Sequence, residues 1–155
     1  SFVDGDDLHP KSNIEKMKSG TPLTDADRLP WLDAIASQMN TWTSQGKNGI
    51  IACSALKAIY RRHLCQQGAH GDHSLFRVIY LHGTHQEIFS RISNRRDHFM
   101  KAHMLESQFE ALEEPPPIRE DAYDDRSSPS EGEFQHSHGG EGAIWVEITA
   151  SSNEI

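Results

Sequence analysis

The chain has 155 residues and a formal net charge of −8, and 35% of its residues are hydrophobic, which is enough for one domain with a buried core. The charge is unevenly spread, because residues 1–114 carry 14 acidic and 13 basic side chains whereas residues 115–155 carry 9 and 2. A nearly neutral body argues against a nucleic-acid-binding protein, and a sequence with no signal peptide and no apolar run of about 20 residues argues against membrane insertion.

Four short apolar runs predict buried strands, and they fall at residues 1–4, 49–54, 75–81 and 143–148. Each run is far from the next along the chain, and helical patterns fill at least the first two intervals. This alternation is typical of an α/β fold in which crossover helices connect the strands of a parallel sheet. The two cysteines, Cys53 and Cys65, are too few for a disulfide scaffold, so we expect a cytoplasmic location.

Three helix starts are predicted by a hydroxyl residue followed three positions later by a carboxylate, the capping-box pattern: Ser12 with Glu15, Thr24 with Asp27, and Thr84 with Glu87. The second of these pairs is the weakest version, and Pro30 after it is expected in the first turn of a new helix. From there Trp31, Ile35 and Met39 recur every four residues, which predicts a helical stripe that faces a core.

The later helices are predicted from a cap and from apolar spacing. Ser54 is expected to cap a helix that follows the second strand, and residues 104–112 carry apolar positions typical of another. Residues 119–142 are acidic and rich in serine and glycine, which is typical of a disordered insertion. The sequence therefore predicts one domain over residues 1–118, interrupted by this insertion and resumed by a last strand within residues 143–155.

Several long motifs occur together in a fixed order. They are "DGDDLHP" at the start, "NIEKMKSGTPLTDADRLPWL" and "CSALKAIYRR" in the middle, and "NRRDHFMKAHMLESQFEALEEP" before the acidic segment. In these motifs the chain resembles the gluconokinases, small P-loop kinases that phosphorylate D-gluconate with ATP. The resemblance runs from Phe2 to about Pro115 and resumes weakly at the final strand. It implies a P-loop kinase-like fold, ATP with Mg²⁺, gluconate as the substrate, and the homodimer that is usual among gluconokinases.

The acidic motif after the first strand carries the first candidate site residues. By the resemblance, Asp6 is the catalytic residue that accepts the proton of the substrate hydroxyl or orients that hydroxyl, Asp4 holds a water on Mg²⁺, and His9 hydrogen-bonds the polyol. Carboxylates are expected near the metal, because phosphoryl transfer mainly needs positioning and charge neutralisation. The alternative is an Asx-type turn that caps the following helix, and for Asp7 this alternative is favoured.

Cationic side chains in two further motifs predict contacts to an anionic substrate. The carboxylate of gluconate favours a bidentate guanidinium, so Arg28 is preferred over Lys16, which can simply lie on a helix surface. The motif "CSALKAIYRR" follows a strand and opens a helix, where open α/β sheets bind anions. Lys57, Tyr60 and Arg61 are therefore assigned to substrate or phosphate binding, with Lys57 and Arg61 on one helical face.

The last candidate residues lie in and after the segment that resembles the mobile lid of these kinases, about residues 91–103. Arg91 and Arg95 are spaced to contact ATP phosphates from one helical face as the lid closes. Gln108 matches a substrate-facing position on the helix that follows. The apolar neighbours on that helix are expected in the core: Leu105, Phe109 and Leu112.

The phosphate-binding loop of the family, G-x-x-x-x-G-K-[ST], does not occur in the sequence. In the family it precedes the strand that ends in "DGD", and its own strand lies centrally, between those at residues 49–54 and 75–81. Without that strand we expect a sheet in two halves, with exposed edges and an uncovered apolar face. We therefore expect a fragment that does not itself turn over gluconate. Two rivals are a kinase of another small polyol or acid, and a catalytically silent protein that binds a partner through residues 119–142.

Overall fold

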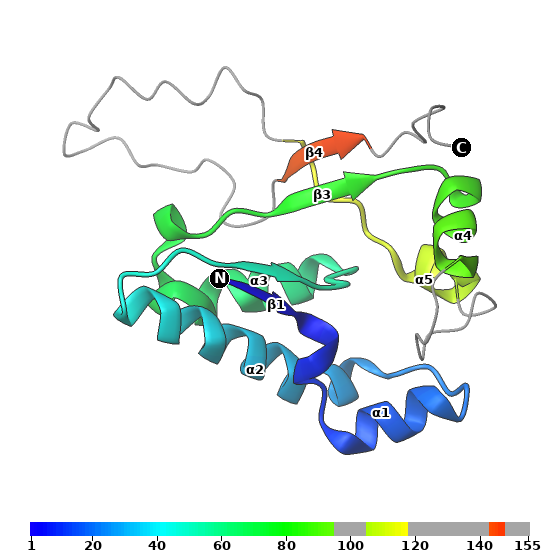
Figure 1. The fold of residues 1–155 in the computed structure, drawn as a ribbon, viewed down its shortest axis with the longest axis horizontal. Helices are drawn as coiled ribbons and strands as arrows, with labels where there is room; N and C mark the ends of the chain where they lie inside the picture. Colours follow the sequence, from blue (N-terminus) through cyan, green and yellow to red (C-terminus); the bar gives the residue numbers. More distant parts are fainter. Residues whose placement is uncertain (95–104, 118–142, 148–155) are drawn as a thin grey trace.

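The structure is a computed structural model that describes residues 1–94, 105–117 and 143–147 (Figure 1). Its elements in chain order are β1 (Phe2–Asp4), the 3₁₀ helix η1 (Gly5–Leu8), α1 (Lys11–Lys18), α2 (Asp25–Ser44), β2 (Ile50–Ala52), α3 (Ala58–Gln67), the 3₁₀ helices η2 (Gly68–Gly71) and η3 (His73–Leu75), β3 (Ile79–His82), α4 (His85–Ser93), α5 (Leu105–Ala111) and β4 (Ile144–Glu147). The predicted α/β class is confirmed.

Some predicted features lie outside the described residues. These are Arg95, most of the lid predicted at residues 91–103, and the insertion predicted at residues 119–142. Within the described ranges, no helix combines the length and the apolar composition that crossing a bilayer requires.

The four described strands form two parallel pairs instead of one continuous sheet. β1 pairs with β2, with Phe2 opposite Ile50, and β3 pairs with β4, with Ile79 opposite Ile144. Among these strands no ladder joins one pair to the other, and Figure 1 draws the two pairs one above the other. All four of these side chains are at least 44% exposed. The predicted parallel pairing, the division into two halves and the uncovered apolar face are confirmed.

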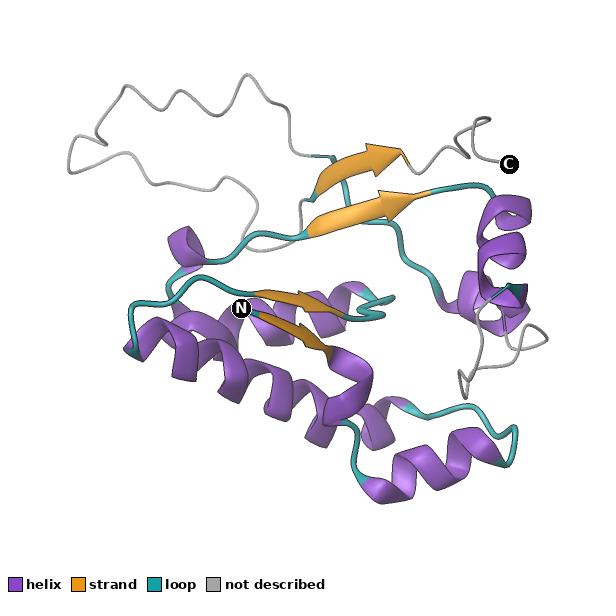
Figure 2. Cartoon of the chain, viewed as in Figure 1, coloured by secondary structure: helices purple, strands orange, loops and turns teal. Residues whose placement is uncertain are grey.

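The core lies where α2 and α3 pack along the β1–β2 pair (Figure 2). A cluster of buried side chains joins the two helices: Trp31, Leu32, Ile35, Tyr60 and Leu64. Met39 packs against this cluster, so the stripe predicted along α2 is confirmed. The indole Nε1 of Trp31 donates a hydrogen bond of 2.7 Å to the Gly5 carbonyl, which ties the end of β1 to α2.

Two of the predicted capping boxes are complete, with each side chain bonded to the other residue's backbone N–H: Thr24 with Asp27, and Thr84 with Glu87. The box predicted at Ser12 is wrong, because α1 begins at Lys11 with Pro10 at its N-cap and no side-chain cap. The new helix predicted at Pro30 is also wrong. The Thr24 box starts α2 before the proline, which then lies inside the helix, where it has no N–H to donate to the carbonyl four residues earlier.

Helix α3 begins later than the cap predicted at Ser54. Its first residue is Ala58, whose backbone N–H donates a 2.6 Å hydrogen bond to Oε2 of Glu113, from the segment after α5. A carboxylate that is distant in the sequence thus accepts a hydrogen bond from the first backbone N–H of this helix. Lys57 therefore precedes α3 in an extended conformation, and the prediction that Lys57 and Arg61 share one helical face is wrong.

Candidate functional site

A pocket of about 510 Å³ lies where the start of α2 meets α1, the residue before α3, and α5. Its volume falls within the range of about 300–1,000 Å³ that is common for small-molecule sites. Arg28, Lys57 and Gln108, three of the residues predicted from the sequence, line this pocket, together with apolar side chains such as Met17 and Leu23. Three segments that are distant in the chain therefore bring two cations and an amide to one cavity.

Asp25, a residue that the sequence analysis did not select, also lines the pocket and pairs with Lys57. It is the first residue of α2, and its carboxylate accepts hydrogen bonds of 2.8 and 3.0 Å from Nζ of Lys57. The Tyr60 hydroxyl donates a further hydrogen bond to the same carboxylate. The bond from Lys57 and then that from Tyr60 lower the pKa of Asp25, and the bond to Asp25 raises the pKa of Lys57. Asp25 and Lys57 are therefore both charged, as expected for an ion pair.

Arg28 lies beside this pair and shares its contact with Tyr60. Its Nη1 donates a 2.5 Å hydrogen bond to the Leu23 carbonyl and a 3.4 Å bond to the Tyr60 hydroxyl. The Arg28 guanidinium carbon lies 5.6 Å from the centre of the Tyr60 ring, and Lys57 Nζ lies 5.8 Å from it. Burial, followed by the bond to Asp25, raises the pKa of the Tyr60 hydroxyl, so this group stays protonated. Tyr60 thus supports both cations of the pocket.

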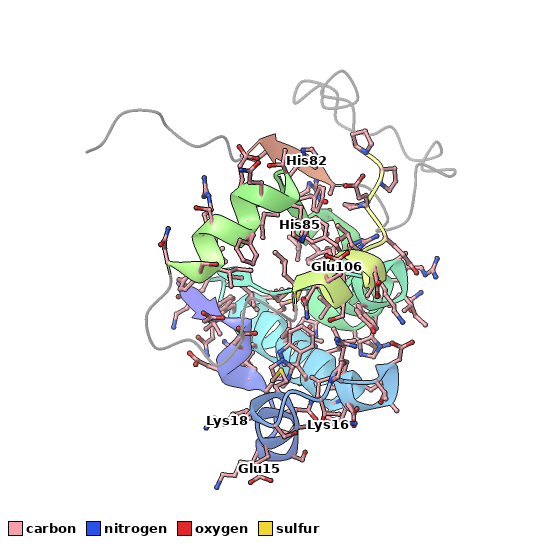
Figure 3. The ribbon with its side chains drawn as sticks, turned by 90° about the vertical axis from the view of Figure 1, so that its right-hand side faces the viewer. Glu15, Lys16, Lys18, His82, His85 and Glu106 are labelled. Atoms are coloured by element: carbon pink, nitrogen blue, oxygen red, sulfur yellow. The ribbon has the colours of Figure 1, made fainter. Side chains whose placement is uncertain are left out.

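Lys16 is engaged elsewhere. Its Nζ lies 2.6 Å from Oδ2 of Asp27, the carboxylate that also closes the capping box of Thr24. These bonds, that of Lys16 first, hold the pKa of Asp27 well below its usual range. In Figure 3, Lys16 is labelled on α1 near the bottom of the molecule, away from α4 and α5. The pair fixes α1 against the start of α2, and Lys16 is not among the residues that line the pocket.

The acidic motif after β1 forms a turn. Oδ1 of Asp4 accepts a 3.0 Å hydrogen bond from the N–H of Asp6, which is the Asx-type geometry weighed in the sequence analysis. Gly5 between them is buried, and a Cβ there would lie 2.7 Å from the Ala52 carbonyl oxygen. Asp4 and Asp7 are exposed and Asp6 is half-buried. The turn therefore displays carboxylates at the C-terminal end of a parallel strand.

The carboxylates of this turn fit a contact to a water of Mg²⁺ and not direct binding of the ion. In the described part of the chain, no group of three His, Cys, Asp or Glu side chains is placed to hold a metal ion. Mg²⁺ commonly keeps several waters and binds one or two carboxylates together with substrate phosphates. The exposed Asp4 suits a contact to such a water, as the sequence analysis expected, but it does not form a metal site by itself.

His9 packs into the protein instead of lining the pocket. Its ring stacks on Trp31 with centroids 4.5 Å apart, and its Nδ1 lies 3.4 Å from Nδ2 of Asn13. Burial, followed by the charge of Arg28, lowers the pKa of His9 to about 4, so the ring is neutral near pH 7. The structure gives His9 a packing role, and His9 is not among the residues that line the pocket.

Arg61 is buried, and its guanidinium holds the loop that presents Lys57. Its Nη1 donates hydrogen bonds of 3.0 and 2.9 Å to the carbonyls of Ala55 and Leu56. Arg61 does not line the pocket. Its contribution to binding a substrate would therefore act through Lys57.

Residues of the lid region are described only at its start. Arg91 lies exposed in the last turn of α4. Figure 3 shows His85 of α4 beside Glu106 of α5, and their Nε2 and Oε2 atoms are 3.4 Å apart. The centroids of the His85 and Phe109 rings also lie 4.9 Å apart. These contacts join α4 to the helix that carries Gln108.

Comparison with known proteins identifies the family, although no protein-family model matches the sequence. The chain is 43% identical over 114 residues to the thermosensitive gluconokinase of Escherichia coli, covering 74% of this chain and 58% of that one. It is 38% identical over 127 residues to a probable gluconokinase of Rattus norvegicus, covering 74% and 69%. The crystal structure of a gluconokinase from Sinorhizobium meliloti superposes with a TM-score of 0.65 at 33% identity, covering 96% and 68%.

The chain spans 58% of the length of the Escherichia coli relative, so the match covers part of such an enzyme. The P-loop kinase-like fold expected from the motifs agrees with the sugar-kinase structures to which the chain is similar. At these identities and coverages, the chain belongs to the gluconokinase family.

Proposed function

We propose that this chain carries the substrate-binding part of an ATP-dependent gluconokinase, an enzyme that transfers the γ-phosphoryl group of ATP to D-gluconate and forms 6-phosphogluconate. The observation that carries the proposal is the pocket in which Arg28, Lys57 and Gln108 converge from three segments of the chain. A cavity with two cations and several hydrogen-bonding groups suits a polyol that bears a carboxylate.

The pocket residues have distinct roles in this proposal. The guanidinium of Arg28 pairs with the gluconate carboxylate, since a planar fork matches a carboxylate better than an ammonium does. Lys57 and the Gln108 amide hydrogen-bond the hydroxyls. Tyr60 and Arg61 hold these groups in place, because one supports the cations and the other fixes the loop before α3.

The reacting end of the substrate is assigned to the turn after β1 and to the lid. Asp6 orients the acceptor hydroxyl or takes its proton, and Asp4 contacts a water of Mg²⁺, which neutralises phosphate charge when it is bound with ATP. Arg91 and Arg95 contact the phosphates. We further propose that the whole enzyme works in the cytoplasm and forms a homodimer.

Calorimetry with the 155-residue chain tests the substrate. We expect D-gluconate to bind and D-glucose, which lacks the carboxylate, not to bind. Arg28→Gln should weaken gluconate binding about tenfold or more, as for loss of a charge-assisted hydrogen bond, whereas Lys47→Gln, which removes an exposed cation outside the pocket, should leave binding unchanged. Equal binding by Arg28→Gln and the unaltered chain would contradict the assignment.

Turnover separates the kinase from its rivals. The sequence contains no G-x-x-x-x-G-K-[ST] loop, so we expect no gluconate-dependent ADP formation by these 155 residues alone. In calorimetry with a panel of other polyols and sugar acids, a compound that binds with a lower dissociation constant than gluconate would identify a different acceptor. If neither gluconate nor ATP binds, the silent binding protein is favoured instead.

A further inference from the structure

The pocket contains a carboxylate as well as its two cations, and this is unexpected for a site that binds an anion. We propose that Asp25 sets the charge that the pocket accepts: by neutralising one of the two cations, it restricts the pocket to sugar acids with a single negative charge. The inference rests on the proposed function, since it concerns the same pocket and the same class of substrate.

The charge of the pocket follows from its lining. Among the described residues, the ionisable side chains that line it are Asp25, Arg28 and Lys57, which together carry one net positive charge. The nearby Lys16 and Asp27 neutralise one another. A ligand with one carboxylate therefore balances the pocket, whereas a ligand with two carboxylates carries one negative charge more than the lining balances.

Asp25 is held in this position from several directions. Its carboxylate accepts both bonds from Lys57 and one from Tyr60, and it lies in the first turn of α2, where the helix dipole favours a negative charge. Its side chain is nevertheless 57% exposed, while that of Lys57 is 29% exposed. Asp25 is thus a fixed charge that a bound ligand meets directly.

A purely structural role is the alternative, in which Asp25 only ties α2 to the residue before α3. The two roles differ in what a neutral side chain would do. A structural tie, once lost, would weaken the binding of every ligand by a similar factor. A charge filter, once lost, would change the preference between ligands of different charge.

Calorimetry with two six-carbon acids distinguishes these roles. D-Gluconate has one carboxylate and D-glucarate has one at each end. We expect the unaltered chain to bind gluconate at least tenfold more tightly than glucarate, and Asp25→Asn to lower this ratio about tenfold or more. Asp33→Asn is the matched control, because it removes a carboxylate of the same helix that pairs with His63 outside the pocket. An unchanged ratio in Asp25→Asn would overturn the proposal.

A double variant tests the charge count itself. Asp25→Asn combined with Lys57→Gln leaves Arg28 as the charged side chain of the pocket lining, with the same net charge as in the unaltered chain. We expect the double variant to regain the preference for gluconate over glucarate, although its affinities are lower. A double variant that keeps the ratio of the single variant would contradict the proposal. If the single variant fails to fold, a ratio in the double variant far below that of the unaltered chain would contradict it.

A measurement without a sugar acid separates this proposal from the proposed function. Lys57 is acylated with a neutral N-hydroxysuccinimide ester or with its sulfonated, anionic form, and the exposed Lys47 serves as the internal reference. Asp25→Asn should raise the ratio of anionic to neutral labelling several-fold at Lys57 and leave it unchanged at Lys47. If gluconate does not bind but this ratio changes, only the proposed function fails; an unchanged ratio at Lys57 overturns the role of Asp25.

Discussion

The two strand pairs of the molecule are built alike and both expose apolar side chains, but the helices beside them are buried very differently. The β1–β2 pair packs on α2 and α3, and most of the buried apolar side chains of the described residues lie between Met17 and Ala69. On the β3–β4 pair, Ile79 and Leu81 are 58% and 56% exposed, and α4 has no buried residue. The comparison shows that a parallel ladder alone creates no core, which requires helices that cover the sheet.

The pocket depends on both regions. Asp25, Arg28 and Lys57 belong to the well-packed region of residues 1–76, whereas Gln108 lies on α5, which follows β3 and α4 and precedes β4. Two hydrogen bonds link α5's C-terminal flank to the loop before α3: from the Glu113 N–H to the Leu56 carbonyl, and from the Ala58 N–H to the Glu113 side chain. The well-packed region of residues 1–76 therefore supplies the charged side chains of the pocket, and α5 supplies Gln108 to the same lining.

The largest expected effect is the loss of the central core side chain. Trp31→Ala should destabilise the protein by about 3–5 kcal/mol, because it leaves a cavity in the cluster and removes the bond to the Gly5 carbonyl and the stack on His9. Phe89→Ala on α4, where the ring is 46% exposed, should cost about 1 kcal/mol or less. Urea unfolding measures both, and similar losses would contradict the contrast between the regions.

Acid should weaken the well-packed region through His9. Its pKa is about 4 in the folded protein against 6.5 for an unperturbed histidine, so the unfolded chain binds the proton first as the pH falls. Stability contributed by neutral His9 is complete above pH 6.5 and declines progressively towards pH 4. We expect His9→Gln to flatten the dependence of Tm on pH in this window. A slope that survives in His9→Gln would exclude this cause.

The smallest effects compare two capping boxes that both begin with threonine. Thr24→Ala and Thr84→Ala each remove a hydroxyl that accepts a backbone N–H at a helix start, which costs about 1 kcal/mol. α2 carries the core, so Thr24→Ala should lower global stability and speed amide exchange throughout residues 1–76. Thr84→Ala should mainly speed exchange within α4, because that helix opens locally. Hydrogen exchange read by mass spectrometry distinguishes the two patterns, and global loss in Thr84→Ala would show that α4 belongs to the same cooperative unit.

Several parts of the fold and site were predictable from the sequence because their causes are local. The capping box at Thr24 and the stripe of Trp31, Ile35 and Met39 each depend on residues within one or two helical turns. Arg28 and Gln108 were selected from motifs of the resembling family and do line one pocket. Asp25 was missed, although it lies three residues before Arg28, because its position in "TDADR" reads equally well as the start of a helix.

By itself, the sequence determined the family, the parallel strand pairing and the main helix of the core, since motifs and periodicity encode these without reference to distant groups. Only the tertiary structure decided where the charged side chains lie. Lys57 reaches Asp25 across 32 positions, and Glu113 sets the start of α3 from 55 positions away. The buried Arg61 donates its hydrogen bonds to the carbonyls of Ala55 and Leu56, in the loop before α3. A long polar side chain bonds to the partner that folding brings within hydrogen-bonding distance, and the residues next to it in the sequence do not specify that partner.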